Sequence, residues 1–183
     1  MFSKKRNDLN NFHGFTLIEL LIVIAVLAIL ATVVFVALNP LARFQDARNS
    51  RRWTDVNAIM GAIKLYQVDK KGFLPPITLG GQTATITYGV NYQIGGNGTD
   101  CNDSNDGAYC IVTMDTDCMN LSSLVTAGYM PNLPVDPNGD SIAATAERTK
   151  YYFRKNANNS ITIGACGVEE GSNASSTLIE VTR

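Results

Sequence analysis

The feature that most constrains this chain is an uninterrupted apolar run near its N-terminus. Between Leu20 and Leu38 no side chain is charged, and Thr32 is the only polar one. A helix rises about 1.5 Å per residue, so the run reaches about 30 Å, the thickness of a bilayer core. The run therefore predicts a helix that is long and apolar enough to span a membrane.

Two features beside this run are unusual for a plain membrane anchor. Glu19 lies inside the apolar segment, where a charge near the bilayer centre costs roughly 2.5–3.5 kcal/mol and calls for a partner. A short basic segment, residues 1–13, leads directly into Gly14 and Phe15, whereas a secretory signal peptide is cut after its apolar region. Cleavage after Gly14 would keep the apolar helix on the mature chain and create a new amino group on Phe15.

Thr16 and Glu19 also have the spacing of a capping box, in which each side chain accepts from a backbone N–H group at the start of a helix. Capping alone explains a glutamate at this position. It does not explain why an ordinary anchor would begin its helix inside an apolar run. The two roles are compatible, so the sequence predicts a helix start here and leaves room for a second role of Glu19.

These N-terminal residues resemble the signature of the type IV pilins and pseudopilins. The matching positions are Lys4, Lys5 and Arg6 in the leader, Gly14 at the cut, Phe15 as the new terminus, and the Thr-Leu-Ile-Glu sequence at 16–19. The resemblance implies that a membrane-embedded prepilin peptidase cleaves after Gly14 and N-methylates Phe15. It also implies that Glu19 neutralises the Phe15 amino group of a neighbouring subunit during filament assembly.

The chain is predicted to divide into a leader (1–14), an apolar helix (15–38), an amphipathic continuation of that helix (39–71) and a globular head (72–183). Asn39-Pro40 predicts a kink or local break, because proline lacks a backbone donor and disfavours helix in the residue before it. A glycine and two prolines after residue 71 predict the helix end. The fold class is α+β, and by resemblance the helix packs on a small antiparallel sheet, as in pilins.

Apolar side chains recur at three- and four-residue steps along residues 39–71, which predicts that one face of this helix packs on the head. The predicted stripe consists of Phe44, Ala47, Trp53, Val56, Ile59, Met60, Ile63 and Tyr66. Arg48, Arg51 and Arg52 are assigned to other faces. We interpret them as a solvated or subunit-facing surface just outside the membrane, in preference to an anion site.

The head is predicted to contain two hairpins, a short helix and two further strands. The hairpins join 77–79 to 83–88 and 151–154 to 160–166, and the further strands span 108–114 and 178–181. The helix spans 117–127, with Asp117 as its cap and Gly128 as its end. The rest of 73–107 is predicted to be irregular.

Charge limits both the partners and the topology. The formal net charge is −1, and without the leader the chain has 12 basic and 15 acidic residues, a net charge of −3. This balance does not support nucleic-acid binding. The basic leader fits the positive-inside rule, so we expect a single-pass protein of the bacterial inner membrane with its leader in the cytoplasm and its head outside.

Four cysteines, Cys101, Cys110, Cys118 and Cys166, lie in the part that is predicted to be outside. An even number in an exported domain favours disulfides, and four cysteines allow three connectivities. We favour the pairs Cys101–Cys110 and Cys118–Cys166. A zinc site is disfavoured because no Cys-x-x-Cys pair is present and the only histidine, His13, lies in the leader.

Residues 129–139 resemble a segment of the G-type major pseudopilin of type II secretion, with the pattern Tyr-x-Pro-x-Leu-Pro-x-Asp-Pro-x-Gly. Asn138 stands where an aromatic residue often follows the Asp-Pro pair. G-type pseudopilins bind calcium near this loop, so the resemblance implies Asp136, Asn138 and Asp140 as calcium ligands. Turn chemistry accounts for the same residues, since proline and glycine here favour a tight turn.

No catalytic constellation is present: the chain has no phosphate-binding loop, no nucleophile elbow and no histidine beyond the leader. The sequence thus predicts a non-enzymatic subunit of a type IV pilus-like filament, and favours a type II secretion pseudopilin. The alternatives are a surface or DNA-uptake pilin, and a membrane-anchored binding module that never polymerises. The implied partners are further copies of the chain, prepilin peptidase, an inner-membrane assembly platform, minor pilins and membrane lipid, with no direct nucleic-acid partner.

Overall fold

The computed structural model describes residues 14–79, 82–83, 86–96, 118–137, 145–146, 148–172 and 178–183. It divides the chain into two compact units, Met1–Pro40 and Leu41–Arg183. The apolar helix belongs to the first unit. The second unit contains the amphipathic helix together with the sheet, so these two parts of the predicted organisation form one body.

The first unit contains helix α1, Leu17–Leu38, which follows the predicted apolar run. The helix ends at Asn39, whose left-handed backbone (φ 38°) breaks the helical geometry. Asparagine is one of the few residues other than glycine that adopt this conformation readily. Pro40 then begins the next helix, a position where its missing N–H group costs nothing. The predicted break at Asn39-Pro40 is confirmed.

Helix α2, Pro40–Asp69, is the main helix of the second unit. Its end has left-handed residues at Lys71 (φ 56°) and Gly72 (φ 92°). The Gly72 N–H group donates to the Gln67 carbonyl oxygen at 2.7 Å, which satisfies a carbonyl that would otherwise have no helical partner. The predicted helix end is confirmed, and glycine is the residue that this conformation favours.

In the described part of the chain, the strands form a seven-stranded sheet in the order β2-β1-β4-β3-β5-β6-β7. The strands are β1 (Thr78–Leu79), β2 (Gln82–Thr83), β3 (Asn91–Gly95), β4 (Met119–Asn120), β5 (Tyr151–Lys155), β6 (Ile161–Ala165) and β7 (Glu180–Thr182). β3 and β4 pair in parallel, with Ile94 opposite Met119, and the other pairs are antiparallel. The sheet is therefore mixed, which corrects the predicted antiparallel sheet at this one pair.

Several local predictions for the head changed with the structure. Strand β3 falls in a stretch that was predicted to be irregular, and the hairpin of β1 and β2 is shorter than predicted. Helix α3 spans only Ser122–Thr126, and the Ser122 N–H group is satisfied by the Asn120 side-chain oxygen at 2.8 Å. Asp117, the predicted cap, and the predicted strand at 108–114 lie outside the described residues.

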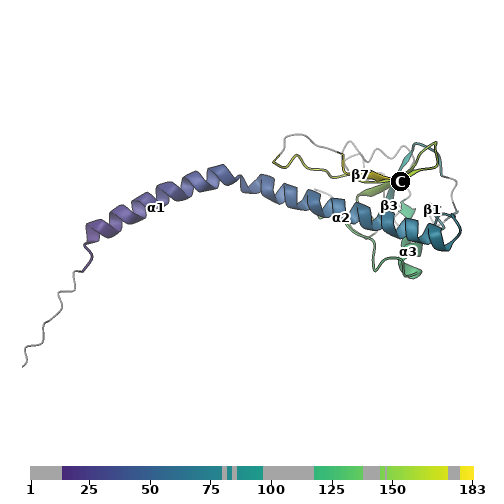
Figure 1. The fold of residues 1–183 in the computed structure, drawn as a ribbon, viewed down its shortest axis with the longest axis horizontal. Helices are drawn as coiled ribbons and strands as arrows, with labels where there is room; N and C mark the ends of the chain where they lie inside the picture. Colours follow the sequence, from purple (N-terminus) through teal and green to yellow (C-terminus); the bar gives the residue numbers. More distant parts are fainter. Residues whose placement is uncertain are drawn as a thin grey trace, which may run out of the picture. The chain divides into compact units, whose positions relative to one another are not determined.

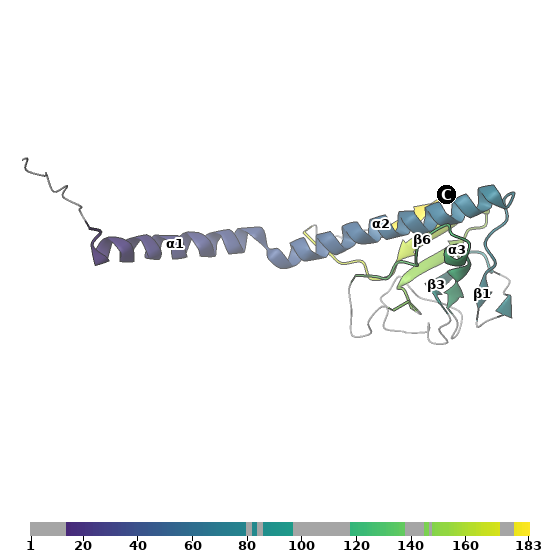
Figure 2. The ribbon, with the colours of Figure 1, turned by 90° about the horizontal axis from the view of Figure 1, so that it is seen from below.

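Helix α2 packs along the sheet, as both ribbon views show (Figures 1 and 2). The shared core brings together Val56, Ile59, Met60 and Ile63 from α2 with Tyr92, Ile94, Tyr151, Phe153, Ile161 and Ile163 from the sheet, all almost fully buried. The predicted stripe is right in its second half. The part of the stripe before Val56 is wrong, because Phe44 and Trp53 are 64% and 42% exposed and Ala47 is exposed as well, while Arg52 is fully buried.

Candidate functional site

The predicted cleavage site lies just before α1, where Thr16 has an extended backbone. Gly14 and Phe15 are both exposed, and Phe15 is 89% exposed. No heavy atom lies within 4 Å of the position that a Cβ at Gly14 would take. Among the described residues nothing covers the bond between Gly14 and Phe15, so the geometry leaves this bond open to a peptidase.

Thr16 and Glu19 form the predicted capping box at the start of α1. The Glu19 N–H group donates to Thr16 Oγ1 at 3.3 Å. In return, Glu19 Oε2 accepts from the Thr16 N–H group and from its hydroxyl, each at 2.9 Å. These bonds use one carboxylate oxygen, and Oε1 takes no part in them. The cap therefore fixes Glu19 beside the new N-terminus that cleavage would create at Phe15.

Helix α1 buries none of its own residues within the chain. Its apolar side chains are exposed by half or more, up to 83% at Val36. In the described parts of the chain it is the one helix long and apolar enough to cross a membrane. An apolar surface of this size is not stable in water and requires lipid or a partner surface.

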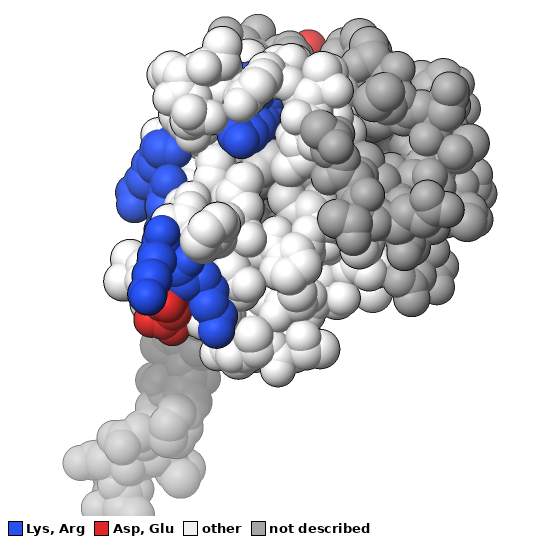
Figure 3. Space-filling view, turned by 90° about the vertical axis from the view of Figure 1, so that its right-hand side faces the viewer, with Lys and Arg blue, Asp and Glu red and all other residues white. Residues whose placement is uncertain are grey.

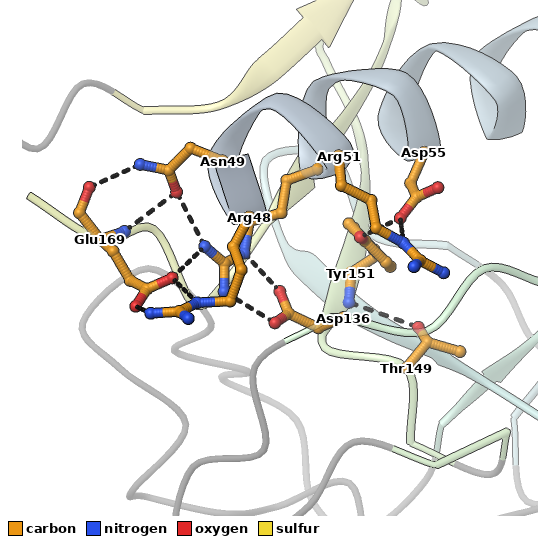
Figure 4. Close-up of polar contacts among 9 residues, drawn as sticks. Arg48, Asn49, Arg51, Asp55, Asp136, Thr149, Tyr151 and Glu169 are labelled. Atoms are coloured by element: carbon orange, nitrogen blue, oxygen red, sulfur yellow. Dashed lines mark hydrogen bonds and ion pairs between the residues drawn. The ribbon is translucent and has the colours of Figure 1, made fainter. Parts of the chain in front are cut away.

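A second cluster of functional groups lies inside the head, where α2 meets two loops (Figure 4). At its centre is Arg52, whose guanidinium is completely buried. Arg52 Nε and Nη2 donate to the two carboxylate oxygens of Asp136 at 2.7 and 2.8 Å, a bidentate ion pair. Removing one partner of such a buried pair typically costs about 3–5 kcal/mol, because the remaining charge is left without compensation.

Glu169 is the second carboxylate of the cluster and comes from the loop after β6. Arg52 Nη1 donates to Glu169 Oε2 at 2.9 Å, and Arg48 Nε donates to the same oxygen at 2.7 Å. Asn49 holds the backbone of Glu169 through its side-chain amide, donating to the carbonyl at 2.7 Å and accepting from the N–H group at 3.2 Å. Three neighbouring residues of α2 thus fix one loop residue.

The hydrogen bonds of this cluster favour the charged forms of Glu169 and Arg52. Burial alone would raise the pKa of Glu169, but the hydrogen bonds from Arg48 and Arg52 outweigh burial and lower this pKa below its ordinary value. Burial would likewise lower the pKa of Arg52, and the hydrogen bonds to Asp136 and Glu169 reverse the effect. Glu169 and Arg52 are therefore charged at neutral pH, and the Glu169 carboxylate accepts hydrogen bonds from two guanidinium groups.

The cluster corrects the interpretation of the arginines as a solvated or subunit-facing surface. Only Arg51 fits that description, with 66% of its side chain exposed, compared with 29% for Arg48 and none for Arg52. A usable signal was present in the sequence. Arg52 precedes Val56 by four residues and Ile59 by seven, so it lies on the buried stripe itself. A charge on such a stripe predicts a buried partner.

The predicted calcium ligands are only partly described. Asn138 and Asp140 lie outside the described residues, so the three-residue set as a whole stays a prediction. Asp136 is 6% exposed, and both of its carboxylate oxygens accept from the Arg52 guanidinium. The Arg52 guanidinium therefore competes with calcium for these oxygens, since calcium binds carboxylate oxygens directly at about 2.3–2.6 Å.

The cysteines also fall partly outside the described residues. Cys118 and Cys166 are buried, with 4% and 2% exposed, and both are disulfide-bonded in the structure. Cys101 and Cys110 are not among the described residues. The pairing of Cys101 with Cys110 and of Cys118 with Cys166 therefore stays a prediction.

The charged side chains at the surface of the head contribute less to its stability than this buried cluster. On the face of the head that Figure 3 presents, Lys and Arg side chains lie in separate groups, and one of these groups lies beside an acidic side chain. Lys70 and Lys71, which are exposed, directly follow the C-terminus of α2, where cations interact favourably with the helix dipole. Ion pairs at such exposed positions contribute little, about 0–1 kcal/mol, so the stabilising charges of the head are the buried ones.

Comparison with known proteins places the N-terminal features in one family. A family model described as the prokaryotic N-terminal methylation motif matches residues 9–35. No curated protein and no solved structure matches the chain. The matched range includes the cleavage site, the capping box and most of α1, and it implies processing by prepilin peptidase and pilus-type assembly. This motif, followed by the long apolar helix α1, supports the resemblance of the chain's N-terminal part to type IV pilins and pseudopilins.

Proposed function

We propose that the chain is a structural subunit of a type IV pilus-like filament, and specifically a pseudopilin of a type II secretion system. The observation that carries this proposal is helix α1. It consists of 22 residues, is capped at Glu19, buries nothing within the chain and lies directly behind an exposed cleavage site. A helix built in this way is suited to exchange one apolar environment for another.

The first environment is the membrane and the second is a set of neighbouring α1 helices. In the precursor, lipid covers the apolar side chains of α1. In a filament, the same side chains pack against those of other subunits, and burial of each large apolar side chain is worth about 1.5–3 kcal/mol relative to exposure in water. Head-to-tail contacts whose rotation does not close a ring generate an open helical polymer.

Glu19 sets the register in which neighbouring α1 helices pack. Cleavage after Gly14 leaves a positive amino group on Phe15, and a positive charge is unfavourable beside the N-terminus of a helix. The capping bonds of Glu19 use Oε2 alone, so Oε1 can accept from the amino group of a neighbouring subunit. In a low-dielectric helix bundle such a pair is stronger than in water and selects the register at which the two groups meet.

The type II assignment rests on the head. The segment Leu133-Pro134-Val135-Asp136-Pro137 resembles that of G-type pseudopilins, and the structure uses it as a structural part of the head, with Asp136 paired to Arg52. In this role the chain assembles with further copies of itself and with minor pilins on an inner-membrane platform. Its loss from the cell should leave exported proteins in the periplasm. Normal secretion with loss of surface fibres or DNA uptake would contradict the type II assignment.

The assembly role is tested by Glu19→Gln in the native host. Glutamine keeps the length and the capping oxygen of glutamate but removes the charge, so the variant should reach the membrane at the native level and fail to enter sheared or pelleted filaments. Thr16→Ala is the matched control, since it weakens the cap and keeps the carboxylate, and it should still assemble. Filaments of Glu19→Gln at the native level would contradict the role of the Glu19 charge in assembly. A native chain that reaches the membrane but is absent from sheared or pelleted filaments would instead favour a membrane-anchored module that does not polymerise.

A further inference from the structure

We infer that Arg52 takes the place of a structural calcium ion in the head of this protein, so that the loop at Asp136 is held by an internal guanidinium and not by a metal. The inference departs from what the resemblance to G-type pseudopilins implies for Asp136, Asn138 and Asp140. It is independent of N-terminal processing and filament assembly.

The Arg52 guanidinium contacts both carboxylate oxygens of Asp136. Arg52 Nε lies 2.7 Å from Oδ2 and Nη2 lies 2.8 Å from Oδ1, so the planar guanidinium occupies both oxygens of the carboxylate at once. A calcium ion at the same carboxylate would have to displace this fork. The displaced guanidinium would then be a buried cation without its main partner, which is strongly unfavourable.

The second argument is the way in which the ion pair is enclosed. The side chains of Arg52 and Asp136 are 0% and 1% exposed. A Cβ added at Gly167 would lie 3.5 Å from Asp136 Oδ2 and 3.6 Å from Arg52 Nη2, so the backbone of Gly167 closes this side of the pair. The Asp136 N–H group donates to the Thr149 carbonyl at 3.0 Å, which ties the loop to the end of the sheet. Hydrogen bonds within the protein therefore hold both the backbone and the side chain of Asp136 in place.

The third argument is the number of segments that the guanidinium joins. Calcium gathers several carboxylate and carbonyl oxygens around one ion. Arg52 likewise joins two carboxylates, because it donates to Asp136 in the loop after α3 and to Glu169 in the loop after β6 (Figure 4). Arg48 supplies the second positive charge on Glu169. Among the described residues of the cluster, two guanidinium groups balance two carboxylates, so a divalent cation there would leave an excess of positive charge.

The inference is tested by thermal unfolding of the full chain in detergent micelles, followed by the fluorescence of its only tryptophan, Trp53. The native chain is compared in 5 mM CaCl₂, 5 mM MgCl₂ and EDTA, and we expect the same midpoint in all three. Arg52→Gln should lower the midpoint by about 10 °C. Arg51→Gln, which changes an exposed neighbour, is the matched control and should shift it by less than about 2 °C.

Two results would overturn the inference. One is a calcium-specific rise of the native midpoint that Asp140→Asn abolishes, which would place a metal in the Asp136 loop. The other is an Arg52→Gln midpoint equal to that of the native chain, which would show that the guanidinium does not hold the loop. An unchanged native midpoint together with the loss in Arg52→Gln would support the inference, and it would mean that folding of the head does not respond to external calcium.

Discussion

At the scale of single residues, the head depends on charges that are removed from water. A lone buried arginine would destabilise the fold, but Arg52 has a carboxylate on each side, Asp136 and Glu169. Each carboxylate comes from a loop, and loops have few apolar contacts with which to fix their position. The ion pairs therefore fix the positions of these loops, as apolar packing fixes the positions of the strands.

Glu169 gives this arrangement a testable dependence on pH. Its hydrogen bonds with Arg48 and Arg52 lower its pKa below the ordinary value of 4.5. A carboxylate with a lowered pKa stabilises the folded state fully above its ordinary value, and this stabilisation is lost as the pH falls through the lowered one. At neutral pH, Glu169→Gln should therefore reduce the free energy of unfolding, by about 1–3 kcal/mol for bonds to a charged partner.

The measurement is urea unfolding of the native chain and of Glu169→Gln at about pH 7 and at about pH 3. The difference between them should shrink in acid, where the native Glu169 is losing its charge. A difference of the same size at both pH values would show that the charge of Glu169 does not contribute.

At the scale of elements, β6 is shaped by one aromatic ring. Tyr152 on β5 lies opposite Gly164 on β6, and Gly164 in turn lies opposite Glu180 on β7. The Tyr152 hydroxyl donates to Glu180 Oε2 at 2.7 Å. The ring therefore crosses the face of Gly164 to reach the next strand, and only a residue without a side chain leaves room for it.

Gly164→Ala should consequently destabilise the head. The added Cβ would lie 2.3 Å from the Tyr152 ring, so the ring must move and its bond to Glu180 is lost. We expect a cost of about 1–3 kcal/mol, measured by chemical unfolding. Gly61→Ala is the control, since no heavy atom lies within 4 Å of the new Cβ on α2, and alanine should stabilise the helix by up to about 1 kcal/mol. A stable Gly164→Ala variant would contradict this account of the ring.

The elements also show what the sequence could predict. The boundaries of α1 and α2 follow from strong local signals, namely the capping box, Asn39-Pro40 and Gly72. Strand β4 was not predicted because it has only two residues, Met119 and Asn120, and its parallel pairing with β3 depends on contacts distant in sequence. The Arg52 cluster was missed because its partners lie 84 and 117 residues away along the chain, although the position of Arg52 on the apolar stripe pointed to a partner.

At the scale of the whole molecule, the two units satisfy different requirements. The described part of Leu41–Arg183 contains an apolar core and an internal ion cluster, so it has a buried interior of its own. In Met1–Pro40 the exposed helix α1 satisfies none of its apolar surface within the chain. This division between a unit with its own core and an exposed apolar helix agrees with the proposed assembly from a membrane.

The central claim is that the chain is a processed pilin-type subunit, and the mass of its N-terminal peptide in the native membrane tests that claim most directly. Processing predicts a peptide that begins at Phe15 and carries one added methyl group. A peptide that begins at Met1, in cells whose prepilin peptidase is active on other substrates, would contradict the account and leave α1 as a plain anchor.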